Sequence, residues 1–320
     1  MILILSQEHD RSTDKVIEWL VYYDIKFIRI NLENHLTISM SHEGVVLIID
    51  AKLKINLSEV KAYWYRRGSF RFFAKLGKKP ELASSFCSSV IEGDAIVLAE
   101  YLDYLLGNKR HINTFATGEV NKLIVLEIAK SVDLKIPDTY FIEDTKQVLD
   151  LFSSNSKRYI TKNLSPMPVF EDLDWGFMLY TTEILKKNVA NFHKNRFFPS
   201  LIQEYVEKLF ELRIFFLNDN FYSMAIFSQL DDQTKIDFRK YNRAIPARRV
   251  PFNLPNEIKD KIIKLMRTLN LNCGSLDFIV DLDGNFYFLE VNPVGQFGMV
   301  SSPCNFFLEK EIVNYLNQES

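Results

Sequence analysis

Cysteine is scarce in this 320-residue chain. Its only three cysteines, Cys87, Cys273 and Cys304, lie far apart in the sequence. An odd number at such spacings supports neither a disulfide framework nor a metal site built from closely spaced cysteine pairs. We expect all three to be free thiols that pack as small apolar residues.

Net charge and long apolar runs are also small. The formal net charge is -2, so the chain lacks the concentrated basic surface with which proteins bind nucleic acids or membrane surfaces, although a local basic cleft stays compatible with this total. No apolar run approaches membrane-spanning length. The N-terminal run Met1–Leu5 is too short for the apolar region of a secretion signal and lacks the basic segment that precedes such a region. We therefore expect a cytoplasmic protein with no nucleic-acid or membrane partner.

What the chain does have is apolar material for a core. Hydrophobic residues make up 47% of it, including 26 Phe and 14 Tyr. A chain of this length is expected to divide into two or three compact lobes. The rings either fill these cores or line a groove for a peptide or nucleotide, and composition alone leaves both alternatives open.

Strand and helix patterns divide the chain into three parts. Residues 1–115 alternate strands with helices, which predicts an α/β lobe with a largely parallel sheet. Residues 116–202 read as a smaller α/β lobe, and residues 203–320 as hairpins with a helix. The expected strands are Ile2–Leu5, Lys26–Ile30, Gly44–Ile49, Ala62–Tyr65, Ile136–Phe141, Arg158–Lys162, Arg213–Leu217 and Phe221–Gln229. The expected helices are Thr13–Tyr23, Ser85–Leu106, Glu119–Val132 (capped by Thr117 or Gly118), Thr145–Ser153 and Asn256–Leu269.

The most informative stretch is a predicted hairpin near the C-terminus. Strand-like residues 275–280 and 286–291 flank Asp283 and Gly284, a pair that favours a two-residue turn. That turn would place Asp277 directly opposite Glu290. Asn292, two residues further on, would share their face.

Two carboxylates that face each other across strands repel, so a bound cation explains them better than a solvated strand face. Oxygen ligands of this kind suit Mg²⁺, which commonly bridges protein carboxylates and substrate phosphates. We also expect the apolar Ile279 and Phe288 on this face, which counts against full exposure. The sequence therefore predicts a magnesium site at Asp277, Glu290 and Asn292.

Candidate groups for the accompanying phosphates lie upstream. Lys122 and Lys162 could act as point charges on phosphate oxygens. Arg213 and Arg239 could each hold a transferring phosphoryl group, or could each form a structural salt bridge. A strand between lobes could offer its backbone to an adenine edge, with Glu207 next to the ribose; its residues are Gln203, Glu204, Tyr205 and Val206.

The order of these elements resembles the ATP-grasp superfamily. The likeness runs from Lys122 and Lys162 through residues 203–206, Glu211–Arg213 and Asp237–Arg239 to Gly274–Asp277 and Phe288–Gln296. Within the superfamily, the chain is most similar to peptide maturases that make graspetides (microviridin-type ω-ester and ω-amide peptides). Residues 63–68, Tyr-Trp-Tyr-Arg-Arg-Gly, resemble a segment of the branch encoded beside a SPASM-domain radical enzyme.

The resemblance implies a fold and a set of ligands. The fold class would be α/β (α+β), with an N-terminal pre-ATP-grasp lobe, a central lobe and a C-terminal antiparallel-sheet lobe. ATP would lie between the last two lobes, with Lys122 and Lys162 on its phosphates, Glu204 and Val206 on adenine and Glu207 on ribose. Two Mg²⁺ ions would be held by Asp277, Glu290 and Asn292, while Arg213 and Arg239 would steady the γ-phosphate and the acyl phosphate.

One departure concerns the lid over the phosphates. Many relatives have a glycine-rich loop after the lysine that corresponds to Lys162, but here Gly176 is the only glycine between Lys162 and Gly274. Another loop geometry must therefore close over the nucleotide, with Ser165 as a candidate phosphate contact.

The implied activity is ATP-dependent macrocyclisation of a ribosomal precursor peptide with a leader and a core. An Asp or Glu side chain would be phosphorylated and then joined to a Ser, Thr or Lys side chain. A SPASM-domain maturase and a second copy of the chain are the other expected partners. Two alternatives share the nucleotide site: a ligase for free amino acids or short peptides, and a non-catalytic ATP-binding protein.

Overall fold

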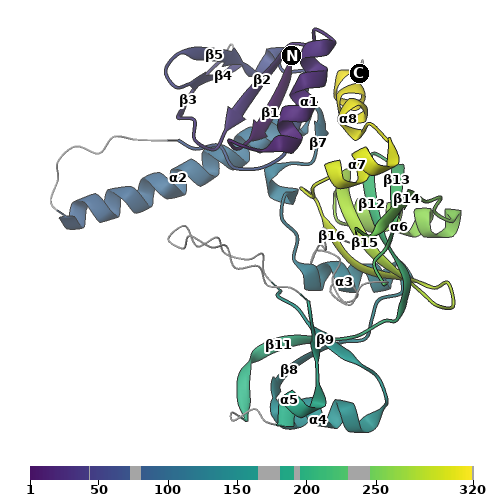
Figure 1. Cartoon of the computed structure of the whole chain (residues 1–320). Coiled ribbons are helices and arrows are strands. Elements are labelled where there is room, and N and C mark those ends of the chain that lie inside the picture. The colour runs from purple at the N-terminus through teal and green to yellow at the C-terminus, as the bar shows by residue number, and fades with distance from the viewer. Residues whose placement is uncertain (43, 73–80, 165–180, 191–194, 230–245, 319–320) are drawn as a thin grey trace.

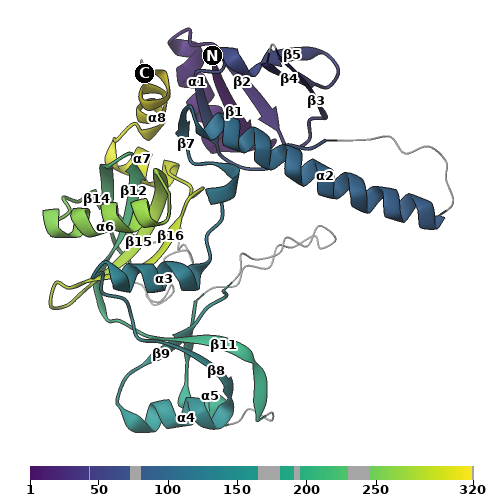
Figure 2. The ribbon, with the colours of Figure 1, turned by 180° about the vertical axis from the view of Figure 1, so that it is seen from behind.

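The computed structural model describes residues 1–42, 44–72, 81–164, 181–190, 195–229 and 246–318, and it shows three lobes (Figure 1). The first lobe and the C-terminal lobe lie against each other, and the central lobe extends away from both (Figure 2). The helix α3 (Lys122–Ser131) lies between the sheet of the C-terminal lobe and the central lobe.

The first lobe contains a parallel sheet, as predicted, with strand order β2-β1-β6-β7. Its central strands are buried on both faces, which is why they read as continuous apolar runs. The elements are β1 (Ile2–Ser6), α1 (Arg11–Tyr22), β2 (Phe27–Asn31), β6 (Ala62–Tyr65), α2 (Glu81–Gly107) and β7 (Arg110–Ile112).

The expected strand Gly44–Ile49 forms, but it does not join the parallel sheet. It is β4, the middle strand of a separate antiparallel sheet with β3 (Leu36–Ser41) and β5 (Leu53–Asn56), neither of which was expected. Burial alternates along β4, and such alternation is typical of a strand with one covered face rather than of a parallel strand buried on both.

The central lobe has an antiparallel sheet with order β10-β9-β11-β8. Its elements are β8 (Thr139–Asp144), α4 (Thr145–Ser154), β9 (Tyr159–Thr161), β10 (Thr182–Ile184), α5 (Lys186–Ala190) and β11 (Arg196–Glu204). The preceding helix, α3, begins later than expected, because the side chain of Asn121 accepts hydrogen bonds from the N–H groups of Leu123 and Ile124. Neither Thr117 nor Gly118 caps it.

The C-terminal lobe has a five-stranded antiparallel sheet with order β14-β13-β12-β15-β16. The first predicted hairpin is confirmed, and its turn is Asn218 and Asp219, both with positive φ. The elements are β12 (Lys208–Leu217), β13 (Asn220–Phe227), β14 (Arg248–Pro251), α6 (Asn256–Thr268), β15 (Cys273–Asp281), β16 (Phe286–Asn292), α7 (Gly298–Cys304) and α8 (Leu308–Asn317).

The two faces of this sheet are covered differently. On one face, Leu212, Phe278 and Phe288 pack against α3 and α6. On the other face, Phe215 and Leu217 pack against α7 and α8. That second core also contains residues of β1, α1 and β6, so the first and C-terminal lobes share one apolar core.

Arg66 strengthens this junction. Its side chain is 3% exposed, and its Nε lies 3.1 Å from Oδ2 of the equally buried Asp10. Its Nη1 donates to the backbone oxygens of Val294 and Gly295 in the C-terminal lobe. The buried guanidinium therefore belongs to the contact between these two lobes rather than to the exposed surface.

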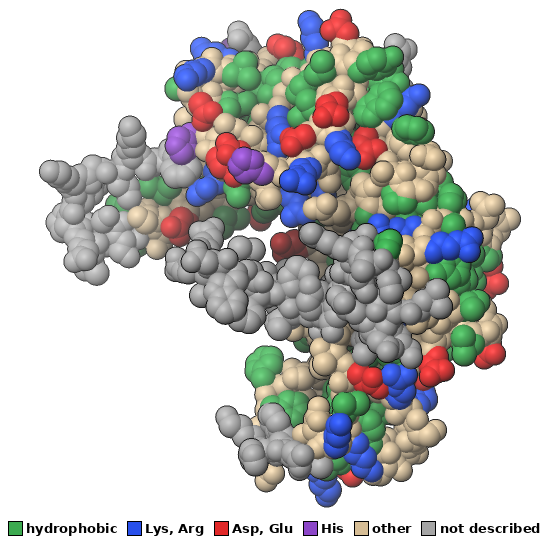
Figure 3. Space-filling model, in the orientation of Figure 1, with side chains coloured by type: hydrophobic (Ala, Val, Ile, Leu, Met, Phe, Trp, Pro, Cys, Tyr) green, Lys and Arg blue, Asp and Glu red, His purple; other side chains and the backbone are tan. Residues whose placement is uncertain are grey.

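The remaining expectations concern thiols, membranes and charge. Cys273 and Cys304 are buried, as expected, whereas Cys87 is only half-buried; all three are free. Among the described residues, no helix is long and apolar enough to cross a membrane. In the view of Figure 3, acidic and basic side chains are intermixed over the first lobe rather than gathered in one basic patch.

Candidate active site between the central and C-terminal lobes

The β15–β16 hairpin turns differently from the prediction. The N–H of Gly284 donates to the backbone oxygen of Asp281, and the N–H of Asp281 donates to that of Asn285. The connection is therefore Leu282, Asp283 and Gly284, with Gly284 at a φ of 83° that favours glycine. The expected two-residue turn is wrong.

The predicted pairing of Asp277 with Glu290 is nevertheless confirmed, because a β-bulge compensates for the longer turn. Near the turn Phe278 pairs with Phe288, but beyond it Asp277 pairs with Glu290, which leaves Leu289 as the extra residue. Phe288 consequently lies on the buried face, with its ring 5.3 Å from that of Phe278. Its expected place beside Glu290 is wrong, whereas Leu289 lines a cavity on the Glu290 face.

Four charged side chains form a row across the open part of the sheet. Nη1 of Arg213 on β12 lies 2.8 and 2.6 Å from the two carboxylate oxygens of Asp277. Nζ of Lys122, the first residue of α3, lies 3.0 Å from Oε2 of Glu290. The two carboxylates predicted to bind metal are thus each paired with a cationic side chain that was predicted to bind phosphate.

Asn292 follows at the end of β16, opposite Ser275. It is exposed, and its Oδ1 accepts a hydrogen bond from the N–H of Val294. The chain then turns so closely over Ser275 that a Cβ on Gly295 would lie 2.6 Å from the Ser275 side chain. Glycine is therefore required at position 295 to hold the segment after Asn292 against β15.

A second bulge occurs in β12, at Leu209. It turns Lys208 and Glu211, which an unbroken strand would point to opposite faces, toward each other. Nζ of Lys208 donates to Oε1 of Glu211, which also accepts from Oγ of Ser228 at 3.0 Å. Burial raises the pKa of Glu211, and the Lys208 ammonium opposes that rise.

Residues 203–207 join the central lobe to β12 and carry much of the predicted adenine and ribose site. Nε2 of Gln203 donates to Oγ1 of Thr139 at 2.9 Å. The Glu204 carboxylate pairs with Lys157 at 3.0 Å, and the N–H of Glu204 donates to the backbone oxygen of Asp138 at 2.8 Å. Tyr205 lies under the Arg158 guanidinium, which also pairs loosely with the largely exposed Glu207 at 3.6 Å.

A narrow cavity of about 70 Å³ connects these parts. It is bounded by the central lobe on one side and by Ile279 and Leu289 of the C-terminal sheet on the other. Lys162 and Lys208 both line it, together with Pro137, Ile160, Thr181 and residues 203–206. The cavity therefore has an apolar floor, two amines and a backbone strand, a suitable lining for a flat base followed by phosphates.

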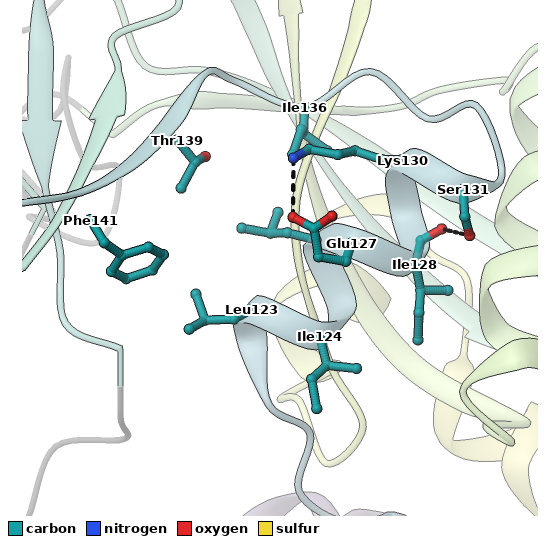
Figure 4. A pocket seen from close by; sticks show the side chains of 10 residues that line it. Leu123, Ile124, Glu127, Ile128, Lys130, Ser131, Ile136, Thr139 and Phe141 are labelled. Carbon is teal, nitrogen blue, oxygen red and sulfur yellow. Dashed lines mark hydrogen bonds and ion pairs between the residues drawn. The ribbon is translucent and has the colours of Figure 1, made fainter.

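A wider groove of about 550 Å³ lies between α3 and β8 (Figure 4). Its walls are mainly apolar, with Leu123 and Ile124 on α3 and Phe141 on β8. Glu127 and Lys130 pair with each other at its edge, at 3.1 Å. Leu123 follows Lys122 directly, so this groove begins beside the charged row.

The structure thus gathers most of the predicted site. Lys122, Arg213, Asp277, Glu290 and Asn292 lie along the open sheet face, and Lys162 lies in the adjoining cavity. Arg239 and Ser165 lie outside the described residues.

Other features of the candidate site were not expected: Lys208, Leu289, and the ion pairs that Lys157 and Arg158 form with Glu204 and Glu207. A lysine three residues before a glutamate was the signal for Lys208, but only the bulge makes the two side chains meet.

The donor set fits a hard cation that is completed by a nucleotide. In the described part of the chain, no three or more His, Cys, Asp and Glu side chains gather into a metal-binding group. Asp277, Glu290 and the Asn292 amide offer few protein oxygens, and Mg²⁺ commonly takes only one or two carboxylates and completes its shell with phosphates and water.

Sequence comparison gives a limited match. No family model matches the chain. Over 93 residues the chain is 28% identical to pyruvate carboxylase of Komagataella pastoris, a match that covers 29% of this chain and 8% of that enzyme.

Structural comparison covers the whole chain. The macrocyclase MdnC of Microcystis aeruginosa MRC, solved with its precursor peptide MdnA, is 24% identical over 99% of both chains with a TM-score of 0.75. A RiPP-associated ATP-grasp ligase of Chryseobacterium gregarium, solved with ADP and a leader and core peptide, is 21% identical with a TM-score of 0.78 and covers 98% of this chain and 94% of that one.

The ATP-grasp ligase PsnB, solved with a minimal precursor, Mg and ADP, is 13% identical with a TM-score of 0.71 and covers 98% of this chain and 96% of that one. Likeness at these identities establishes architecture rather than activity. Three lobes in this order, matched from end to end, show that the chain has the ATP-grasp fold.

Proposed function

We propose that this chain is an ATP-dependent peptide maturase. It would phosphorylate Asp or Glu side chains of a ribosomal precursor peptide and join them to Ser, Thr or Lys side chains as ω-esters or ω-amides. The observation that carries the proposal is the row Arg213–Asp277–Glu290–Lys122 beside the interlobe cavity. The end-to-end likeness to enzymes solved with precursor peptides supports the substrate class.

In this proposal the cavity receives ATP. The backbone of residues 204–206 would meet adenine, Ile279 and Leu289 would pack against its ring, and Lys162 would reach the phosphates. Asp277, Glu290 and Asn292 would hold Mg²⁺, with two ions proposed, and the metal would neutralise phosphate charge. Lys122 and Arg213, now paired with these carboxylates, would pass to the phosphate oxygens.

The chemistry is acyl transfer through an activated carboxylate. A peptide carboxylate oxygen attacks the γ-phosphorus, the bond to the bridging oxygen breaks, and ADP leaves with an acyl phosphate formed. A peptide hydroxyl or amine then attacks the acyl carbon, phosphate leaves, and the attacking group loses its proton. The protein's part is to position the groups and stabilise the charge. The guanidinium groups of Arg213 and Arg239 are proposed to stabilise the negative charge on the transferring phosphoryl group.

We place an apolar stretch of the peptide in the groove between α3 and β8. The groove begins at Leu123, next to Lys122, so a peptide held there would reach the charged row with its following residues. Ile124, 57% exposed in this groove, provides a test. The variant Ile124→Asp is expected to weaken peptide binding about tenfold, whereas Leu53→Asp on β5 is expected to leave it unchanged.

The partnership with a SPASM-domain enzyme stays a proposal supported by residues 63–68. Tyr63, Trp64 and Tyr65 of this segment are buried, and Arg66 connects two lobes, so the fold accounts for much of that likeness. Co-purification of the two proteins when they are expressed together is the direct test; separate elution would contradict the partnership.

The deciding experiment uses, as candidate precursor, any short peptide that is encoded beside this chain. Incubation with ATP and Mg²⁺, followed by mass spectrometry, is expected to show loss of one water for each bond formed. Glu290→Gln should abolish this loss, whereas Glu257→Gln on the exposed face of α6 should not. Unmodified peptide with the wild-type protein would refute macrocyclisation.

The same assay separates the alternatives. Phosphate release that depends on free amino acids rather than on the peptide would favour a small-molecule ligase. No phosphate release with any acceptor would favour a non-catalytic ATP-binding protein.

A further inference from the structure

Arg158, the residue before β9, contacts three side chains at once. Its Nε and Nη2 donate to the two carboxylate oxygens of Glu183 on β10, at 2.7 and 2.8 Å. Its guanidinium carbon lies 4.0 Å from the centre of the Tyr205 ring. Its Nη1 lies 3.6 Å from Oε1 of Glu207. Two of these contacts hold the guanidinium in place, and the third connects it to Glu207.

Stability does not account for the contact with Glu207. The Glu207 side chain is 66% exposed, and a loose pair between exposed charges contributes little to the free energy of unfolding. The contact does restrict where the Glu207 carboxylate lies. Glu183 and Glu207 both contact one guanidinium, so the two carboxylates would repel each other if Arg158 were lost.

Arg158 belongs to the wall of the interlobe cavity. Side chains at positions 158, 160 and 162 of an extended chain point to one face, and Ile160 and Lys162 line the cavity. Tyr205 also lines it, and the N–H of Tyr205 donates to the backbone oxygen of Arg158 at 2.8 Å. One short strand therefore has Arg158 at its start and Lys162, the proposed phosphate contact, at its end.

Glu207 lies where the ribose of a bound nucleotide is expected. Residues 204–206 line the cavity and are proposed to meet adenine, whereas Lys162 is proposed to reach the phosphates. The sugar of a nucleotide lies between its base and its phosphates, and Glu207 directly follows the residues proposed for the base. An ionised carboxylate only accepts hydrogen bonds, which suits the hydroxyl groups of a ribose.

We infer that Arg158 is a positioning residue that orients Glu207 toward the ribose, and that it thereby selects ribonucleotides over 2′-deoxyribonucleotides. The inference rests on the proposed function, because it takes the cavity to receive a nucleotide. With Oε1 of Glu207 next to Nη1 of Arg158, Oε2 accepts a hydrogen bond from the 2′-hydroxyl. A 2′-deoxyribose leaves this oxygen without its donor.

Calorimetric binding of ADP and 2′-deoxy-ADP in the presence of Mg²⁺ measures this selection. The wild type is expected to bind ADP about tenfold more tightly, a modest ratio because water can replace the hydroxyl at an exposed carboxylate. Arg158→Met and Glu207→Ala should each lower the ratio of the two Kd values below about threefold. Arg196→Met, which removes an exposed ion pair with Glu143 in the same lobe, should leave the ratio unchanged.

The ratio separates a positioning role from a structural one. A general disturbance of the central lobe weakens the binding of both nucleotides alike and does not change the ratio. In the Glu207→Ala background, Arg158→Met should not lower the ratio further, because Arg158 acts through Glu207. Arg158→Lys keeps the charge but loses the fork that spans two carboxylates, so its ratio should be closer to that of Arg158→Met than to that of the wild type.

Several outcomes would overturn the inference. They are a wild type that binds ADP without preferring it, a wild-type ratio in Arg158→Met or Arg158→Lys, and a further fall of the ratio in the double variant. A wild type that binds neither nucleotide would overturn the proposed function as well, so the two failures are distinguishable.

Discussion

Replacing Arg66 by methionine tests how the lobes are held together. The substitution keeps an unbranched side chain but removes the partner of a buried carboxylate, that of Asp10. Removing one member of a buried ion pair typically costs about 3–5 kcal/mol. Asp10 would keep two donors, the N–H of Ser12 at 3.3 Å and Oγ1 of Thr13 at 2.8 Å, which places the electrostatic cost near the lower limit.

The backbone oxygens of Val294 and Gly295 would also lose their donor, at about 1 kcal/mol for a typical hydrogen bond. We therefore expect Arg66→Met to lower the free energy of unfolding by about 3–4 kcal/mol. Burial lowers the pKa of Arg66, and Asp10 opposes that fall, which agrees with a guanidinium that depends on this carboxylate.

Denaturant unfolding of four proteins measures the effect: the wild type, Arg66→Met, Asp10→Asn and the double variant. The double variant should lose less than the sum of the single losses, because the second change removes the charge that the first left unpaired. Arg267→Met, in an exposed pair with Asp219, should cost at most about 1 kcal/mol. A loss below about 1 kcal/mol for Arg66→Met, or additive losses, would refute the reasoning.

Three further predictions concern the sheet face. Phe288→Ala should cost about 3–5 kcal/mol in the free energy of unfolding, because Phe288 is fully buried; a loss below about 1 kcal/mol would put it back on the open face. Leu289→Ala should weaken ADP binding about three- to tenfold by calorimetry, and an unchanged Kd would remove Leu289 from the nucleotide cavity. Because burial raises the pKa of Glu211 in the folded chain, its contribution to stability is fully present below the unfolded pKa and is lost as pH rises through the folded pKa. In thermal unfolding from acid to neutral pH, the melting temperature of Glu211→Gln should therefore rise relative to that of the wild type as pH rises. A difference in melting temperature that stays constant with pH would contradict the raised pKa of Glu211.

Local pattern predicted much of the fold. Several elements lie close to their expected positions: β1, β2, β6, α1, α4 and the β12–β13 hairpin. They could be predicted because apolar periodicity and turn residues can be recognised within a short stretch of sequence. The start of α3 was missed because the cap is the side chain of Asn121, whereas Thr117, an equally plausible cap by composition, lies in a separate 3₁₀ turn.

The site was harder to predict because two bulges change which side chains share a face. An extra residue such as Leu209 or Leu289 carries no compositional signal, yet it reverses the alternation of every residue beyond it. The pairing of Asp277 with Glu290 held because the longer turn and the bulge at Leu289 offset each other. Lys208 and Phe288 were missed or misplaced for the same reason.

The burial of Arg66 was not predicted, because a charged residue is usually exposed. Its partners, Asp10 and the oxygens of residues 294 and 295, lie far from it in sequence at both ends of the chain. No local window contains them, so burial of the guanidinium could not be inferred from the segment around it.

The core shared by α1 and α8 has a consequence for synthesis on the ribosome. Val16 and Leu20 pack with Leu308, Ile312 and Leu316, which are made about 290 residues later in translation. At roughly 5–20 residues per second, about 15–60 s would separate the emergence of the two helices. During that interval the first lobe has a parallel sheet with one apolar face open, and this face is covered only when α8 has been made. The first lobe should therefore require protection of its apolar face until α8 emerges, although that face is covered in the finished structure.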